Sequence, residues 1–435
     1  MTLLGLSLLE DRHPDENPLL ASCLVIPSIL LDVINRRSTL VAAPAGYGKT
    51  TLAYLARAAT TTWFHVVLSN DDLDADRIID SLMSTMTKQL WRSLGDRPEQ
   101  FERLGRRAEA VKYFLQQYVG MEIDYWLETL AEDHPEQAGL LQGLARLQTR
   151  QLFTETADDE LRVSILLDCI VRLGYDGVGI WLDLHEELEE LPDNLRDSLA
   201  YIYDFLALLR NRSLFIKCLA TPPTIGFLES RRGPQTLSTD RLTLDWSQER
   251  LALLIDRRLE VASRGRVLRL DDLIESARFR TFLRDYADLH SPAAWVNLAR
   301  QLAQQINLSG TMPATGTDWL AARRAYCAEH LKIRRDREGR FWRGNQLLEG
   351  LVPRKRAIYP LIDHLYENPG FHRTYQFTRQ LYVDENILNK TISRARKEHI
   401  EPQLDAGGAE ESGFIYLVTD HKGGGYGLQH TDRSP

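Results

Sequence analysis

The chain has 435 residues, of which 43% are hydrophobic and 26% charged, and its formal net charge is −8. This ordinary balance excludes collagen-like, low-complexity and highly charged disordered chains. No apolar run reaches the roughly 18–20 residues of a membrane-spanning helix, and the four widely spaced cysteines show no metal-ligand pattern. We therefore expect a cytoplasmic protein without a membrane segment.

The N-terminal part predicts a strand, a glycine-containing turn and a helix. Residues 38–43 are a short apolar run typical of a buried strand, and 50–57 follow with a helical pattern. A second strand is expected at 63–68. Asn70-Asp71-Asp72 then turns the chain and caps the next helix.

Helices and strands alternate through the next two hundred residues. A helical insertion is expected at about 75–173, then strands at 177–182 and 214–220. Strands separated by helices predict a parallel sheet covered by helices. Residues 245–305 return to a helical pattern, and the turn-rich stretch 309–317 is the best candidate for a linker.

The turn after the first strand has the pattern of a phosphate-binding loop. Ala43–Thr50 fits it if the first position is Ala instead of Gly. Gly46 and Gly48 allow backbone N–H groups to converge on phosphate oxygens, and the following helix directs its positive end at the anion. We predict that ATP or ADP contacts Pro44, Ala45, Gly46, Tyr47, Gly48, Lys49, Thr50 and Thr51.

Within this loop, Lys49 is expected to reach the β- and γ-phosphates and Thr50 to bind Mg²⁺. The site also needs an acidic residue at the end of a neighbouring strand, and Asp183 follows the third predicted strand. Glu186 is a candidate for orienting a hydrolytic water, although the start of a solvated helix is the favoured explanation of this residue. The chain is therefore expected to be a slow ATPase.

The last hundred residues predict a small basic module. Residues 331–400 hold fifteen Lys or Arg and eight Asp or Glu, a net charge of +7 within an acidic chain, which indicates a nucleic-acid contact or a solvated basic face. Short strands and two helices precede a third helix that runs from Asp384 to about Ile400. A strand at 414–419 and a glycine-rich turn then predict a hairpin.

The third helix carries a basic face. Its candidate DNA contacts, together with one in the hairpin turn, are Lys390, Arg394, Arg396, Lys397 and Lys422. Ile387, Thr391 and Ala395 lie on another face, which we expect to enter the core. A basic face on the last helix of three suits the DNA major groove, although such modules also bind proteins.

The N-terminal motifs resemble the STAND ATPases, in particular the branch of the maltose regulator and the large LuxR-type regulators. The matching residues are Val25–Pro27, Leu40–Leu52, Trp63 and Asn70–Asp74. The resemblance implies an AAA+/STAND-like core that opens on binding an inducer or sensor protein, exchanges ADP for ATP and self-associates. It also implies a nucleotide contact from Pro292, where this chain has His-Ser-Pro instead of the usual Gly-x-Pro.

The match is incomplete after the third strand. Asp183-Leu184-His185 has one acidic residue where the family usually has two. This departure affects the expected rate of ATP hydrolysis more than the expected binding of the nucleotide. The C-terminal order resembles the winged helix of OmpR/PhoB-type regulators, through Leu351–Arg356, Asn389–Arg396 and Thr419–Leu428.

These observations predict a P-loop domain at 1–244, a helical lid at 245–308, a linker and helix at 309–330, and a winged helix at 331–435. Three functions remain open. The first is an ATP-switched regulator that binds double-stranded DNA. The second is an Orc/Cdc6-like, transposition or phage-defence ATPase acting on DNA. The third is a signalling scaffold whose winged helix binds protein. DNA-stimulated turnover would favour the second, and absence of DNA binding the third.

Overall fold

The computed structural model describes residues 23–69, 73–120, 122–147, 158–184, 192–209, 213–231, 240–263, 269–336, 338–344, 346–348, 351, 358–381, 384–395, 417–420, 425–428 and 431. The chain forms two compact units. One is Ile26–Asp245, and the other combines Met1–Val25 with Trp246–Pro435. No helix among these residues has the length and apolar character needed to cross a membrane.

A five-stranded parallel sheet organises the first unit, in the order β2-β3-β4-β1-β5. Its strands are β1 (Thr39–Ala42), β2 (Trp63–Ser69), β3 (Gly177–Asp183), β4 (Leu214–Ala220) and β5 (Asp240–Thr243). Both central strands β3 and β4 are buried along their whole length, as apolar strands of a helix-covered parallel sheet are. This confirms the predicted α/β class.

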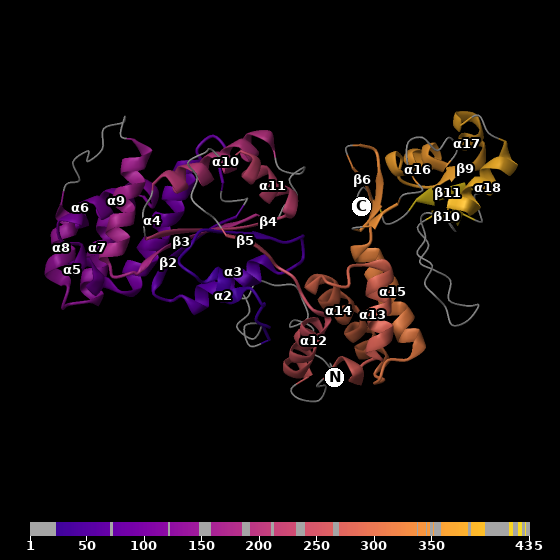
Figure 1. Cartoon of the computed structure of the whole chain (residues 1–435), viewed down its shortest axis with the longest axis horizontal. Helices are drawn as coiled ribbons and strands as arrows, with labels where there is room; N and C mark the ends of the chain where they lie inside the picture. Colours follow the sequence, from indigo (N-terminus) through magenta and orange to yellow (C-terminus); the bar gives the residue numbers. More distant parts are fainter. Residues whose placement is uncertain are drawn as a thin grey trace. The chain divides into compact units, whose positions relative to one another are not determined.

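Short helices cover the sheet. Figure 1 shows α2 (Leu30–Val33) and α3 (Lys49–Ala59) on one side, and α10 (Asp193–Leu208) and α11 (Pro222–Ser230) on the other. The strand order places β1 between β4 and β5, so its C-terminal end lies beside that of β4. Ligands of open α/β sheets bind at the carboxyl ends of such strands.

A helical insertion separates β2 from β3. It contains α4 (Ile78–Asp96), α5 (Phe101–Leu104), α6 (Ala108–Tyr118), α7 (Ile123–Asp133), α8 (Ala138–Arg146) and α9 (Asp159–Arg172). Leu82, Leu115 and Leu166 belong to the same apolar core as the sheet residues Ile180 and Ile216. The insertion is therefore packed against the sheet as part of one folded unit.

A buried lysine fixes two helices of this insertion. Lys112 on α6 is 2% exposed, and its Nζ donates to the carbonyl oxygens of Leu144, Ala145 and Leu147 at 2.9, 2.9 and 2.6 Å. It also pairs with Asp124 Oδ1 at 2.6 Å. A cation at the end of α8 satisfies carbonyl groups that have no partner within the helix.

The second unit begins with a helical bundle made of α12 (Gln248–Ser263), α13 (Ser276–Tyr286), α14 (Pro292–Ser309) and α15 (Gly316–His330). Phe279 packs against Trp295 and Trp319 in its core. Gln301 on α14 donates to Glu329 on α15 at 2.5 Å. Residues 310–315, expected as a linker, thus join two helices that pack together.

The rest of this unit contains two small sheets and three helices. One sheet is β6 (Ile333–Arg335), β7 (Phe341–Arg343) and β8 (Gln346–Leu347), and the other has the order β10-β11-β9. The helices are α16 (Ile358–Glu367), α17 (Thr374–Leu381) and α18 (Glu385–Ala395); the strands are β9 (His372–Arg373), β10 (Leu417–Asp420) and β11 (Gly425–Leu428). Figure 1 shows these helices beside the second sheet.

Glycines permit the close pairing of β11 with β9. A Cβ atom on Gly425 would lie 2.6 Å from the His372 carbonyl oxygen, and one on Gly427 would lie 2.9 Å from the Gly370 carbonyl oxygen. Both contacts are with backbone atoms, which cannot swing aside. Glycine therefore lets the β10–β11 hairpin pair with the short strand between α16 and α17.

Candidate functional site

The loop between β1 and α3 has the conformation expected of a phosphate-binding loop. Gly46 and Gly48 have φ angles of +77° and +83°, a left-handed region that glycine enters without a steric cost. Gly48 immediately precedes the first helical residue, Lys49. The loop therefore ends in the exposed N–H groups of a new helix, where an anion is stabilised.

Lys49 lies back across the loop that precedes it. The residue is 5% exposed, and its Nζ donates to the carbonyl oxygens of Ala43 and Pro44 at 3.1 and 3.2 Å. These contacts hold a positive charge over the turn. Of the other predicted contacts, Pro44, Ala45 and Gly46 are exposed, whereas Tyr47 is buried.

Thr50 and Asp183 meet at the carboxyl edge of the sheet. The Thr50 hydroxyl donates to Asp183 Oδ2 at 2.6 Å, although the residues are 133 positions apart. Asp183 is the last residue of β3 and is 5% exposed. Its other oxygen, Oδ1, is buried and has no hydrogen-bond partner among the described residues.

This pair fits a magnesium ion. Mg²⁺ takes oxygen ligands, commonly one or two protein groups together with water and substrate phosphates. Thr50 Oγ1 and the Asp183 carboxylate are such groups, and Oδ1 is a buried acceptor to which no described residue donates. No cluster of three or more His, Cys, Asp or Glu side chains suited to a metal occurs in the described part of the chain.

Neighbouring strand ends complete the edge of the sheet. Ser69, the last residue of β2, pairs in register with Asp183; sequence reasoning ended that strand one residue earlier and so missed it. Thr221, just after β4, is fully buried, and its hydroxyl contacts that of Thr224 at 2.9 Å.

Leu184, which follows Asp183, is also fully buried, and its N–H donates to the Leu219 carbonyl oxygen at 2.8 Å. Glu186 lies outside the described residues.

Burial shapes the ionisation of side chains in the same sheet. Burial, and then the nearby Asp183 carboxylate, raises the pKa of the Cys218 thiol to about 12, so this cysteine is an inert core residue. Burial lowers the pKa of His65 to about 4. The His65 ring is therefore neutral: Nδ1 accepts from Trp181 Nε1 at 3.1 Å, so Nε2 carries the proton that it donates to the Thr60 carbonyl oxygen at 2.9 Å.

Pro292 lies in the other compact unit. It is the first residue of α14, and Ser291 caps that helix by accepting a hydrogen bond from the Ala294 N–H at 3.3 Å. Its predicted contact with the nucleotide stays a prediction.

The basic helix α18 presents part of the predicted DNA face. Lys390 and Arg394 are exposed, whereas Leu388, Ile392 and Ala395 are buried. Ile387, expected in the core, is 47% exposed, so that prediction was wrong. The prediction for Ala395 is confirmed, and the core stripe is Leu388, Ile392 and Ala395, on a helix that packs against α16 and α17.

The hairpin contacts the same helix. The Tyr426 hydroxyl on β11 donates to Asn389 Oδ1 at 2.6 Å, which joins the β10–β11 hairpin to α18. Arg396, Lys397 and Lys422 lie outside the described residues. The exposed face of α18 therefore combines two cations with a neighbouring, anchored hairpin.

Among the comparisons with known proteins, only the search of solved structures found similar proteins. No protein-family model matches the chain, and no curated protein matches it. The DNA complex of ORC1 from Aeropyrum pernix is 13% identical, with a TM-score of 0.40, covering 100% of this chain and 95% of that one. The RuvB Holliday junction branch migration motor from Thermotoga maritima is 13% identical, with a TM-score of 0.34, covering 97% and 96%.

A third structure, Cdc6p from Pyrobaculum aerophilum, is 9% identical, with a TM-score of 0.37, covering 98% of this chain and 94% of that one. These values are too low to carry an argument about function. The α/β P-loop fold of residues 26–245 rests instead on the sheet order, the glycine loop and the Thr50–Asp183 contact.

Proposed function

We propose that the chain is a P-loop ATPase that binds ATP with Mg²⁺ and acts on double-stranded DNA through its C-terminal module. The observation that carries the nucleotide half is the contact between Thr50 and Asp183, which leaves one buried carboxylate oxygen without a donor in the described part of the chain. A hydroxyl after the loop lysine and an acid on a neighbouring strand are the pair that a phosphate-bound Mg²⁺ requires.

The residues of the loop have separate tasks in this proposal. The N–H groups before α3 bind phosphate oxygens, and Lys49 exchanges its two carbonyl partners for the β- and γ-phosphates. Thr50 and Asp183 would hold Mg²⁺, which supplies charge neutralisation of the phosphates.

Hydrolysis is expected to be slow without a stimulus. Many ATPases have a second acid directly after the strand-end aspartate, and here that residue is the buried Leu184, whose N–H is used by the sheet. Glu186 remains the candidate for orienting water. The missing acid favours a second candidate function: an ATP-switched regulator that self-associates in the ATP state and responds to an inducer or sensor protein.

The DNA half of the proposal rests on α18 and its hairpin. We interpret α16, α17, α18 and the β9–β11–β10 sheet as a winged helix. In it, Lys390 and Arg394 face the DNA, and the predicted contacts Arg396, Lys397 and Lys422 extend the same surface. A helix with a buried apolar stripe and an exposed basic stripe is what the major groove accommodates.

The experiment is ATP hydrolysis by the full chain with and without duplex DNA at low salt. Turnover that DNA raises, and that Lys49→Ala abolishes, is expected for an ATPase acting on DNA. Slow turnover with DNA binding that depends on ATP would select the regulator. If the protein binds no DNA but captures a protein partner when ATP is present, the scaffold function replaces both, and the DNA half of the proposal is wrong.

A further inference from the structure

A cavity of about 710 Å³ lies in the helical insertion between β2 and β3. It is formed by the end of α4, the connection from α6 to α7 and the first turns of α7. The lining residues are Trp91, Val119, Gly120, Glu122, Ile123, Tyr125, Trp126 and Thr129. Its volume falls within the roughly 300–1,000 Å³ of small-molecule sites.

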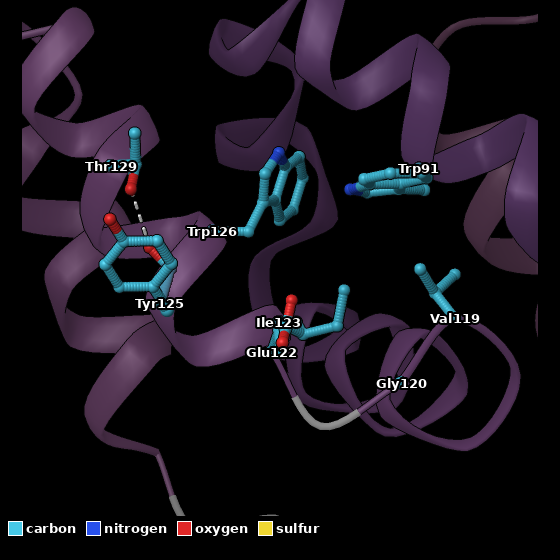
Figure 2. A pocket seen from close by; sticks show the side chains of 8 residues that line it. All are labelled: Trp91, Val119, Gly120, Glu122, Ile123, Tyr125, Trp126 and Thr129. Atoms are coloured by element: carbon cyan, nitrogen blue, oxygen red, sulfur yellow. Dashed lines mark hydrogen bonds between the residues drawn. The ribbon is translucent and has the colours of Figure 1, made fainter.

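Aromatic side chains dominate this cavity. Figure 2 shows Trp91 and Trp126 around it, with Tyr125 from the same helix as Trp126. The two indole rings are 6.0 Å apart at 69°, an edge-to-face arrangement. Tyr125 is 73% exposed, although tyrosine rings normally cover apolar surface in a folded insertion.

The polar groups in the lining set the charge of a ligand. Glu122 is its only charged residue among the described ones, and it is exposed. The helix that follows, α7, carries no Lys or Arg; its Asp124 pairs with Lys112, and its other acids are Glu128, Glu132 and Asp133. An anion would be repelled here, whereas a cation would be attracted by the acids and by the faces of the aromatic rings.

A further observation shows room for a ligand. A Cβ placed on Gly120 would meet no atom within 4 Å, so the connection between α6 and α7 borders open space.

We propose that this cavity binds a small organic cation, an ammonium group on an apolar body. The apolar body lies among Trp91, Trp126 and Ile123, and the ammonium group lies between the Tyr125 ring and the Glu122 carboxylate. The site is separate from the phosphate loop, and it gives the insertion a ligand that the proposed function does not assign.

The test uses the full chain and three probes with the same aromatic body: phenethyltrimethylammonium, neutral 4-phenyl-1-butanol and anionic 4-phenylbutyrate. Binding is measured by calorimetric titration through the millimolar range. The cation is expected to bind saturably and more tightly than the neutral alcohol or the anion. Equal affinity for the neutral alcohol or the anion, or no saturable binding of the cation, would overturn the proposal.

Two exposed positions provide variants that leave the fold intact. Tyr125→Ala and Glu122→Gln should each weaken binding of the cation by about two- to fivefold, the size of an exposed cation–π or ion-pair contact. The exposed Glu260→Gln on α12 and the exposed Tyr201→Ala on α10 are matched controls that should bind normally. Unchanged affinity in both cavity variants would contradict the assignment.

Binding of the probe should also be normal in Lys49→Ala. If the wild-type protein fails to bind nucleotide but still discriminates among the probes, only the proposed ATPase is wrong. If it binds nucleotide but does not discriminate among the probes, only the cavity assignment is wrong.

Discussion

Asp183 and Thr50 illustrate what the sequence reveals at the scale of single residues. The glycine pattern of the loop predicts Lys49 and Thr50, and a run of apolar residues ending in an acid predicts Asp183. The sequence predicts that both residues hold one Mg²⁺, but it does not predict their direct hydrogen bond. That contact depends on the order β3-β4-β1, which brings two strand ends together across a long insertion. The neutral state of His65 on β2 could not be predicted from the sequence either, because it follows from burial of the ring beside Trp181.

Asp183→Asn is expected to weaken the Mg²⁺ dependence of nucleotide binding. Asparagine keeps the size of the side chain but removes the charge, so Mg²⁺ affinity in the nucleotide complex should fall by about 10- to 100-fold. Titration of Mg²⁺ against a fluorescent ATP analogue measures this. Asp176→Asn, which removes an exposed carboxylate paired with Arg36, is the control; equal losses in both variants would show a nonspecific charge effect.

His65 predicts a loss of stability in acid. Its pKa is about 4 in the folded state, below the ordinary value of 6.5 for histidine, so between these values only the unfolded chain binds the proton. The free energy of unfolding should therefore decrease as pH falls from 6.5 towards 4, by up to about 3 kcal/mol.

The measurement is the urea midpoint of wild type and His65→Gln, followed by circular dichroism from about pH 7 to about pH 4.5. Glutamine can replace both hydrogen bonds of the ring but does not titrate. The difference in urea midpoint between wild type and His65→Gln should change with pH across that window. A constant difference would mean that His65 is not the titrating group.

At the scale of secondary-structure elements, apolar runs predicted β1 to β4 but not β5. Asp240–Thr243 has only four residues with alternating partial exposure, and its pairing with β1 defines it more than its composition does. The prediction of the core face of α18 contained a related error. Adjacent positions on a helix differ by about 100°, and only packing against α16 and α17 distinguishes the stripe through Leu388 from the one through Ile387.

The basic stripe of α18 predicts a salt-dependent DNA affinity. Each contact between a cation and a phosphate contributes about one to the slope of log K against log salt. Lys390→Ala and Arg394→Ala should each lower that slope by about one if both residues contact phosphates. Fluorescence anisotropy of a labelled duplex gives the slope.

Arg278→Ala on α13 is the control for this measurement, because its exposed guanidinium pairs with Glu275 outside the C-terminal module. A slope that changes as much in this control as in the α18 variants would place the DNA elsewhere.

At the scale of the whole molecule, the sequence shows an acidic chain with a basic C-terminal segment. The structure divides the chain into two compact units, with a boundary after Asp245. The helical insertion could be predicted as a block, but not its cavity. That cavity depends on how the α6–α7 connection leaves space beside Trp91 and Trp126. Sequence patterns report periodicity along one element, whereas cavities arise from residues on several.

The most direct test of the central claim is the affinity for ATP with Mg²⁺ of wild type, Lys49→Ala and Lys49→Met. Methionine keeps the buried aliphatic stem, so a folding defect is separated from loss of charge. Both variants should bind at least about 30-fold more weakly, as loss of about 2 kcal/mol from a buried charged contact implies. The exposed Lys88→Ala on α4 should bind normally. Undiminished affinity in Lys49→Met and Lys49→Ala would contradict the assignment of this loop as the nucleotide site.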